Sequence, residues 1–150
     1  MKNHILIQEN NFVKAREKIK KNKNKIIVFS SNDDELNRKV LEKIPIDILL
    51  LNQSKKRDFQ KQRDSSFNHV LAKIAKKNNV AIGINLDEVI NSEEKTKAEI
   101  LARIKQNIKL CNKNKLKMEF ISPSGIKRSK HDLKALGLVL GMPTWMTSKL

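Results

Sequence analysis

Residues 55–84, KKRDFQKQRDSSFNHVLAKIAKKNNVAIGI, contain a basic segment, an amphipathic helix pattern and an apolar run in direct succession. Helical i, i+3, i+4, i+7 and i+8 spacing relates the apolar residues Phe67, Val70, Leu71, Ile74 and Ala75. The run that follows is too short for a stable helix and is rich in isoleucine. We therefore predict a helix over Ser66–Lys77 that packs on one side, followed by a buried strand over Val80–Ile84.

The same succession of apolar runs and helical patterns extends along the rest of the chain. Further short runs predict strands at Ile5–Ile7, Ile26–Phe29, Ile46–Leu51 and Leu116–Ile121. Helical patterns between them predict helices at Phe12–Lys20, Asp34–Lys43, Glu94–Asn112 and Lys130–Leu140. Repeated strand–helix units of this kind indicate an α/β fold built on a parallel sheet.

Polar residues and glycine mark several of the expected helix ends. Ser129 with Asp132, and Asn91 with Glu94, have the spacing of a capping box at a helix start. Gly141, with a proline two residues later, predicts the end of the last helix. These signals place the expected boundaries close to those of the apolar periodicity.

The chain of 150 residues has the length of one domain and is long enough to bury a core. We expect an α/β domain at 1–142 and a C-terminal tail at 143–150, which is either an edge cover or a docking peptide. The sequence has no apolar run of about 20 residues and no signal-peptide pattern, so we expect a cytoplasmic protein. Cys111 falls on an apolar helix face and is expected to be a buried structural thiol.

Basic residues are in large excess, with 32 lysines and arginines against 16 acids and a net charge of +16. This charge favours an acidic partner, either nucleic acid or a membrane surface. One tryptophan, no tyrosine and five phenylalanines leave few aromatic side chains for stacking on unpaired bases. A basic α/β surface of this composition suits the phosphate backbone of folded, double-helical RNA.

The basic segment 55–63 has five basic residues and one acid, and it follows the predicted strand Ile46–Leu51. The carboxyl ends of such strands are where βα barrels build their sites. Arg57 and Arg63 are the best candidates for phosphate contacts, because a guanidinium binds phosphate through two parallel hydrogen bonds. The expected contacts continue over the polar sides of two helices and a later loop, and the full set is Lys55, Lys56, Arg57, Lys61, Arg63, Lys73, Lys76, Lys77, Arg103, Lys127 and Arg128.

Several neighbouring features have more than one interpretation. Asp58 and Asp64 are expected to be structural, as the ion-pair partner of a neighbouring arginine and the start of a helix cap. The lysine-rich run 14–25 is either an RNA contact or a solvated face. His69 either contacts RNA or bonds a backbone carbonyl, and SPSG at 122–125 is either a phosphate-facing loop or an ordinary turn.

Three blocks of the sequence resemble the ribonuclease P protein component 3 family, the thirty-kilodalton subunit of archaeal and eukaryotic ribonuclease P. They are RDFQKQRDSSFNHVLAKIAKKNNVAIGI at 57–84, ILARIKQNIKLCNKNKLKMEFIS at 100–122 and SKHDLKALGLVLGM at 129–142. The resemblance implies a TIM-barrel-like fold of the polymerase-and-histidinol-phosphatase (PHP) kind. The first βα units of that barrel have no counterpart here, so we expect a shortened barrel completed by a dimer, another subunit or RNA; an open, doubly wound sheet is the alternative.

The same resemblance implies a function within the ribonucleoprotein that removes the 5′ leader from precursor tRNA. Catalysis is then expected from the RNA, with Mg²⁺ held at the RNA and no cofactor or metal bound by this chain. The implied partners are ribonuclease P RNA, precursor tRNA and other protein subunits, especially a small companion subunit, with no membrane. A homodimer and a heterotetramer both remain open.

Two other functions compete with this one. A standalone PHP-type metal-dependent phosphoesterase gathers histidines and carboxylates at the barrel mouth, whereas His4, His69 and His131 are far apart in this sequence. A non-catalytic interaction module would use the basic face to recruit acidic proteins or membrane. Selective binding of folded RNA distinguishes the ribonuclease P subunit from the module.

Overall fold

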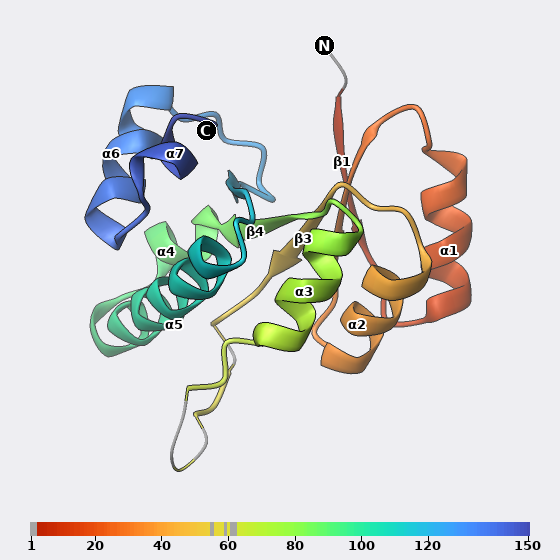
Figure 1. Ribbon diagram of the computed structural model, residues 1–150, viewed down its shortest axis with the longest axis horizontal. Helices are drawn as coiled ribbons and strands as arrows, with labels where there is room; N and C mark the ends of the chain where they lie inside the picture. The colour runs from red at the N-terminus through yellow and green to blue at the C-terminus, as the bar shows by residue number, and fades with distance from the viewer. Residues whose placement is uncertain (1–2, 55, 59, 61–62) are drawn as a thin grey trace.

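The computed structural model describes residues 3–54, 56–58, 60 and 63–150 (Figure 1). In these residues the strands are β1 (His4–Gln8), β2 (Ile26–Ser30), β3 (Ile48–Leu51), β4 (Ala81–Asn85) and β5 (Met118–Ile121). The helices are α1 (Phe12–Lys21), α2 (Asp34–Lys43), α3 (His69–Lys77), α4 (Leu86–Asn91), α5 (Glu94–Lys113), α6 (Lys130–Leu140) and α7 (Thr144–Thr147). No helix in the described ranges is long and apolar enough to cross a membrane.

The five strands form one parallel sheet in the order β1-β2-β3-β4-β5. A doubly wound sheet reverses its strand order at a switch point, and this sheet does not reverse. The doubly wound alternative is therefore wrong, and the TIM-barrel-like arc is confirmed. Among the described residues, β1 pairs with β2 alone and β5 with β4 alone, so both ends of the arc are edges.

The two faces of the sheet are packed differently. Outward-pointing residues such as Phe29, Leu49 and Ile82 belong to the main core together with residues of the helices. Figure 1 shows α1, α2 and α3 side by side along this face, with α5, α6 and α7 gathered at the other end of the molecule. The inner face carries a small cluster of strand residues centred on Ile48 and Leu50, which are at most 1% exposed.

Gly83 lies on the inner face, where the strands approach closely. A Cβ at this position would lie 3.1 Å from Ile48 Cγ2 and 3.1 Å from Leu50 Cδ1. Such contacts are tighter than ordinary van der Waals packing, so a larger side chain here would push β3 and β4 apart. The close packing of the inner face thus depends on a small residue at this point.

Most expected boundaries are confirmed within one or two residues, but the start of α3 and the expected cap of α5 are corrected. α3 begins at His69 because the Asn68 side chain accepts a hydrogen bond from Leu71 N at 3.0 Å, so Asp64 is not its cap. Asn91 ends the short helix α4, which the apolar pattern did not predict, and α5 begins after Glu93.

The expected signals at the two ends of α6 have different outcomes. Ser129 is at the N-cap position but its side chain makes no capping hydrogen bond. Gly141 ends the helix in the left-handed conformation with φ of 102°, as its glycine predicted. α6 thus begins and ends at the expected residues, although one of its caps lacks the expected bond.

The last eight residues pack against the rest of the chain. Met146 in α7 is fully buried in the main core. Trp145 is half-buried, and its Nε1 donates a hydrogen bond to Asn112 Oδ1 at the end of α5 at 2.9 Å. Residues 143–150 therefore cover the end of α5, and whether they also cover a sheet edge or dock another chain stays a prediction.

Candidate nucleic-acid interface

The predicted basic segment lies in the loop between β3 and α3, at the carboxyl end of the sheet. The described parts of this loop project beyond α3 at the lower edge of Figure 1. Lys56, Arg57 and Arg63 belong to these parts, whereas Lys55 and Lys61 lie outside the described residues. The position at a strand's carboxyl end is the one predicted from the sequence.

Arg103 of α5 holds this loop from inside the protein. Its Nη1 donates to Gln53 O at 3.2 Å, and its Nη2 donates to Lys56 O at 3.0 Å. The same guanidinium bonds Asp58 Oδ1 through Nε at 3.2 Å and Nη2 at 3.1 Å. Arg103 is 2% exposed, so its expected place on the polar face of α5 is wrong, and its guanidinium positions the loop from within the protein.

A carboxylate and two amides fix the loop where it leaves β3 and where it returns. The Glu88 carboxylate of α4 accepts hydrogen bonds from Gln53 N at 2.7 Å and from Ser54 Oγ at 2.8 Å. On the returning side, Ser65 O accepts a hydrogen bond from Gln53 Nε2 at 2.9 Å. Gln106 of α5 donates to Arg63 O at 3.3 Å, beside that point. The loop is thus tied to α4 and α5.

These contacts leave the loop arginines facing solvent. Arg57 and Arg63 are exposed, and neither forms an ion pair within the described residues. Asp58 does form the predicted ion pair, but with Arg103 instead of a neighbouring arginine. Lys56 is partly committed, because its Nζ lies 3.0 Å from Asp34 Oδ1. Two uncompensated guanidinium groups on an anchored loop can bind phosphate at a small entropic cost.

Lys127 and Arg128 lie in the loop between β5 and α6, which also starts at a carboxyl end of the sheet. Both side chains are exposed. Ser124 N at the start of this loop donates to Asp87 Oδ2 of α4 at 2.8 Å. The helix α4 therefore anchors both basic loops, the first through Glu88 and this one through Asp87.

Not all the lysines of α3 lie at the carboxyl end of the sheet. Lys73 is exposed at mid-helix, and Lys76 and Lys77 lie in the last turn, about 12 Å from the helix start by the rise of an α-helix. The last turn leads into β4, so these two lysines lie at the amino-terminal end of the sheet. Lys76 Nζ donates to Lys115 O there at 3.1 Å. The expected continuous surface is thus divided between the two ends.

A row of uncharged polar side chains crosses the mouth of the arc and was missed by the sequence analysis. Asn85 Nδ2 donates to Asn52 Oδ1 at 2.8 Å, and Asn52 Nδ2 donates to Ser30 Oγ at 2.9 Å. With Gln8, these residues end four successive apolar strand runs, which is the signal that would have revealed them. Amides and hydroxyls donate and accept hydrogen bonds, but they supply neither a general base nor a strong metal ligand.

The mouth is hollow beside this row. One cavity of about 520 Å³ lies between the ends of β1, β2 and β3, and Glu9 and Lys14 line it. The Lys18 ammonium donates to the Glu9 carboxylate and holds the pKa of that carboxyl below its ordinary value. The acid of this cavity therefore stays ionised and paired at neutral pH.

The chain is similar to one known protein family over almost its whole length. Residues 4–146 match the family model described as RNase P subunit p30. The chain belongs to the RNase P subunit p30 family. The matched range includes the whole sheet and both basic loops at its carboxyl end.

Curated relatives of this p30-family chain are archaeal. It is 30% identical over 111 residues to "Ribonuclease P protein component 3" of Methanococcus maripaludis strain C6, covering 73% of this chain and 45% of that protein. It is 33% identical over 88 residues to the protein of the same name from Methanothermobacter thermautotrophicus, covering 59% and 34%. The chain spans about half the length of the curated relatives it matches, or less.

The fold has solved counterparts as well. A chain of the cryo-EM structure of archaeal ribonuclease P with mature tRNA superposes with a TM-score of 0.76 and 26% identity, covering 95% of this chain and 62% of that one. An uncharacterised protein superposes with a TM-score of 0.51 at 8% identity, which reflects the fold alone.

In the p30-family chain, the residues at the barrel mouth differ from those of a PHP-type metal centre. Among the described residues, no three His, Cys, Asp or Glu side chains come together as a group that can hold a metal ion. His69 is exposed in the first turn of α3, and His4 lies at the opposite end of the sheet from the mouth. Asparagine, glutamine and serine end the strands at the mouth, and the nearby carboxylates Asp87 and Glu88 accept hydrogen bonds from the two basic loops.

Proposed function

We propose that this p30-family chain is a protein subunit of ribonuclease P that binds the RNA of the complex through the basic loops at the carboxyl end of its sheet. Family membership and the likeness to a chain of archaeal ribonuclease P support this proposal. The net charge of +16 suits a polyanionic partner.

The observation that carries the proposal is the anchored loop. Arg103 is buried, and its guanidinium donates hydrogen bonds to two backbone carbonyls and to Asp58. These bonds fix the segment that bears Arg57. Gln106 fixes the backbone of Arg63. A solvated lysine-rich face needs no such internal support, whereas a phosphate-binding loop gains affinity when it is held in place before binding.

The chain assists the reaction through its charge. Lysine and arginine placed between RNA helices neutralise neighbouring phosphates and release counterions, which lowers the cost of packing those helices together. The RNA then performs the chemistry, with Mg²⁺ held at the RNA. No nucleophile or general base is assigned to this chain.

The proposed partners are ribonuclease P RNA, precursor tRNA and the small companion protein subunit, in the cytoplasm. Within the described ranges, β1 and β5 each lack a second neighbouring strand, and these edges offer a surface for completing the barrel. Another subunit, a second copy of this chain or RNA would each satisfy the unpaired backbone groups there.

The deciding experiment is cleavage of precursor tRNA by the matching ribonuclease P RNA and companion subunit at limiting Mg²⁺. We expect removal of the 5′ leader to rise several-fold when this chain is added. Tight RNA binding without any gain in cleavage would show an RNA-binding relative without the ribonuclease P role. If anionic vesicles compete with folded RNA for the chain at physiological salt, a general basic module is the better description.

A further inference from the structure

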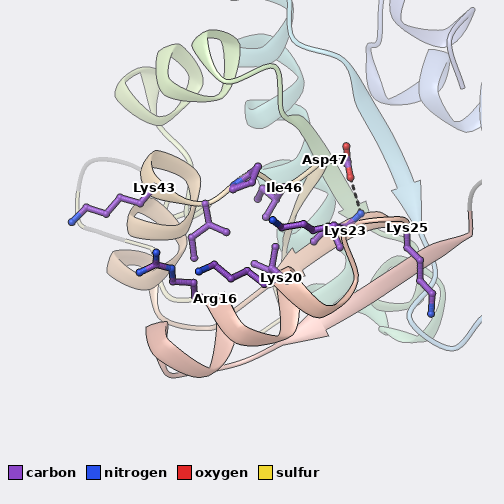
Figure 2. Close-up of a pocket in the computed structure, with 11 residues that line it drawn as sticks. Arg16, Lys20, Lys23, Lys25, Lys43, Ile46 and Asp47 are labelled. Atoms are coloured by element: carbon purple, nitrogen blue, oxygen red, sulfur yellow. Dashed lines mark hydrogen bonds between the residues drawn. The ribbon is translucent and has the colours of Figure 1, made fainter.

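A second basic pocket lies at the amino-terminal end of the sheet, opposite the anchored loop. It is formed by the end of α1, the turn into β2 and the loop between α2 and β3, and its volume is about 520 Å³. Figure 2 shows Arg16, Lys20 and Lys23 around this pocket, with Lys43 and Lys25 extending outward on either side of it. We propose that this pocket is a second phosphate-binding site of the protein, for the backbone of folded RNA.

The charge of the pocket is not neutralised within the protein. Its lining has five basic side chains and one carboxylate, Asp47. Asp47 Oδ2 accepts a hydrogen bond from Ile27 N at 2.8 Å, so its charge is directed at the sheet. None of the five basic residues belongs to an ion pair within the described part of the chain.

Helix ends account for only part of this cluster. α1 and α2 both point their C-termini here, and each helix end carries roughly half a negative charge that a lysine can offset. Lys20 and Lys43 have this structural explanation. Lys23 and Lys25 lie beyond the end of α1, and Arg16 lies before its last turn. Five cations less one carboxylate and two helix ends leave a net charge of about +3.

The floor of the pocket increases the effect of this charge. Ile19, Ile27, Ile44 and Ile46 line it, and each is at most 7% exposed. A cleft with charges of one sign above apolar walls concentrates the electric field and raises the local concentration of the opposite ion. A phosphate in the pocket therefore gains more than it would beside isolated surface lysines.

The basic residues of the adjoining cavity differ from those of the proposed pocket, because they have partners within the protein. On the other side of Asp47, Lys117 pairs with Glu119 at 3.0 Å, and Lys115 and Lys149 lie over the Trp145 ring at 5.6 and 5.9 Å. Their charges have partners in the fold. The cations of the proposed pocket have no ion-pair partner among the residues that the structure describes, which favours an external anion there.

The pocket lies apart from the anchored loop, at the other end of β3. The pocket precedes β3 and the anchored loop follows it, and four strand residues span about 13 Å. The two sites must therefore meet different phosphates, so the chain would bridge two segments of one folded RNA. This inference rests on the proposed RNA-binding function.

The test compares three variants of the full chain bound to ribonuclease P RNA. The pocket variant carries Arg16→Gln, Lys20→Gln and Lys23→Gln; the loop variant carries Arg57→Ala and Arg63→Ala. The control carries Lys95→Gln, Lys105→Gln and Lys109→Gln, which removes three charges from exposed positions of α5. Binding is measured against salt concentration, and protected nucleotides are mapped by hydroxyl-radical footprinting.

We expect the pocket variant to lower the salt slope, log K against log salt, by about 2 to 3 and to lose protection at a segment that the loop variant still protects. A salt slope equal to that of the control overturns the second site. If the loop variant alone weakens binding, the proposed function stands and the pocket inference fails. If the unaltered chain binds no RNA, both fail. A pocket variant that loses binding to phosphatidylserine vesicles but not to RNA also overturns the inference.

Discussion

The Arg103 guanidinium lies 3.1 Å from the Asp58 carboxylate, although 45 residues separate them in the chain. The arginine side chain is 3% exposed and the aspartate side chain 38%. One end of the ion pair is therefore within the protein and the other is at the surface, beside the basic loop. The contact links the packing of α5 to the position of Arg57.

Arg103→Ala should destabilise the protein by about 2 to 4 kcal/mol, because it leaves two carbonyls and Asp58 without their shared partner. Urea unfolding measures this change. Arg103→Lys should recover only part of the loss, since an ammonium cannot reproduce the guanidinium fork. Lys105→Ala, two residues along and exposed, should change stability by less than about 0.5 kcal/mol. Equal stability of Arg103→Ala and Lys105→Ala would refute the anchoring role.

Arg57→Ala combined with Arg63→Ala should reduce the slope of log K against log salt for RNA by about 2, with little change in melting temperature. Both side chains are exposed and unpaired in the described structure, so their loss costs the fold almost nothing. Titrations at several salt concentrations provide the measurement. Lys95→Ala with Lys109→Ala removes the same charge from α5. If that pair lowers the salt slope equally, the loop arginines contribute only through the overall charge of the protein.

Asn52→Ala should cost about 1 to 2 kcal/mol, because it removes one hydrogen bond to Ser30 and one from Asn85 at the mouth. A double-mutant cycle with Asn85→Ala should give a coupling energy of at least about 0.5 kcal/mol. Chemical denaturation of the single and double variants supplies the four free energies. Strictly additive effects would show that the amide row is not a connected network.

The Cys111 thiol is buried on α5, and burial raises its pKa to about 12 from the ordinary 9.0. The folded state therefore keeps the thiol neutral at pH values where the unfolded chain ionises it. Its contribution to stability is fully present below pH 9 and is lost as the pH rises toward 12. Unfolding measured from pH 8 to pH 11 should show a steeper loss for the natural chain than for Cys111→Ala. Parallel curves would contradict this assignment.

Labelling with a thiol reagent provides an independent check on the same residue. Modification of Cys111 at pH 8 should require opening of the protein, because the thiol is both buried and neutral. The labelling rate should therefore rise with denaturant in parallel with unfolding. Rapid labelling of the folded chain would show that α5 opens locally.

The fold was largely predictable from local pattern, and the site only in part. Alternating apolar runs and helical spacing predicted all five strands and five of the seven helices of the described structure, because these periodicities depend on neighbouring residues alone. α4 was missed because six residues hold less than two helical turns of pattern. α3 begins three residues later than the predicted Ser66 because Asn68, three residues before Leu71, caps it in place of Asp64.

The sequence by itself determined the repeated βα units, the charge of the protein and the basic loop after β3, since composition and short-range periodicity carry this information, whereas the strand order that makes the sheet an arc came from the structure. Only the tertiary structure decided that Arg103 is buried under that loop and that the lysines divide between two ends of the sheet. Helical spacing relates Arg103 to Ile100 and Asn107 on one buried face of α5, but only a carboxylate 45 residues away supplies the partner that makes burial of its charge favourable. Contacts between distant segments form through packing of the whole chain, and no local pattern specifies them.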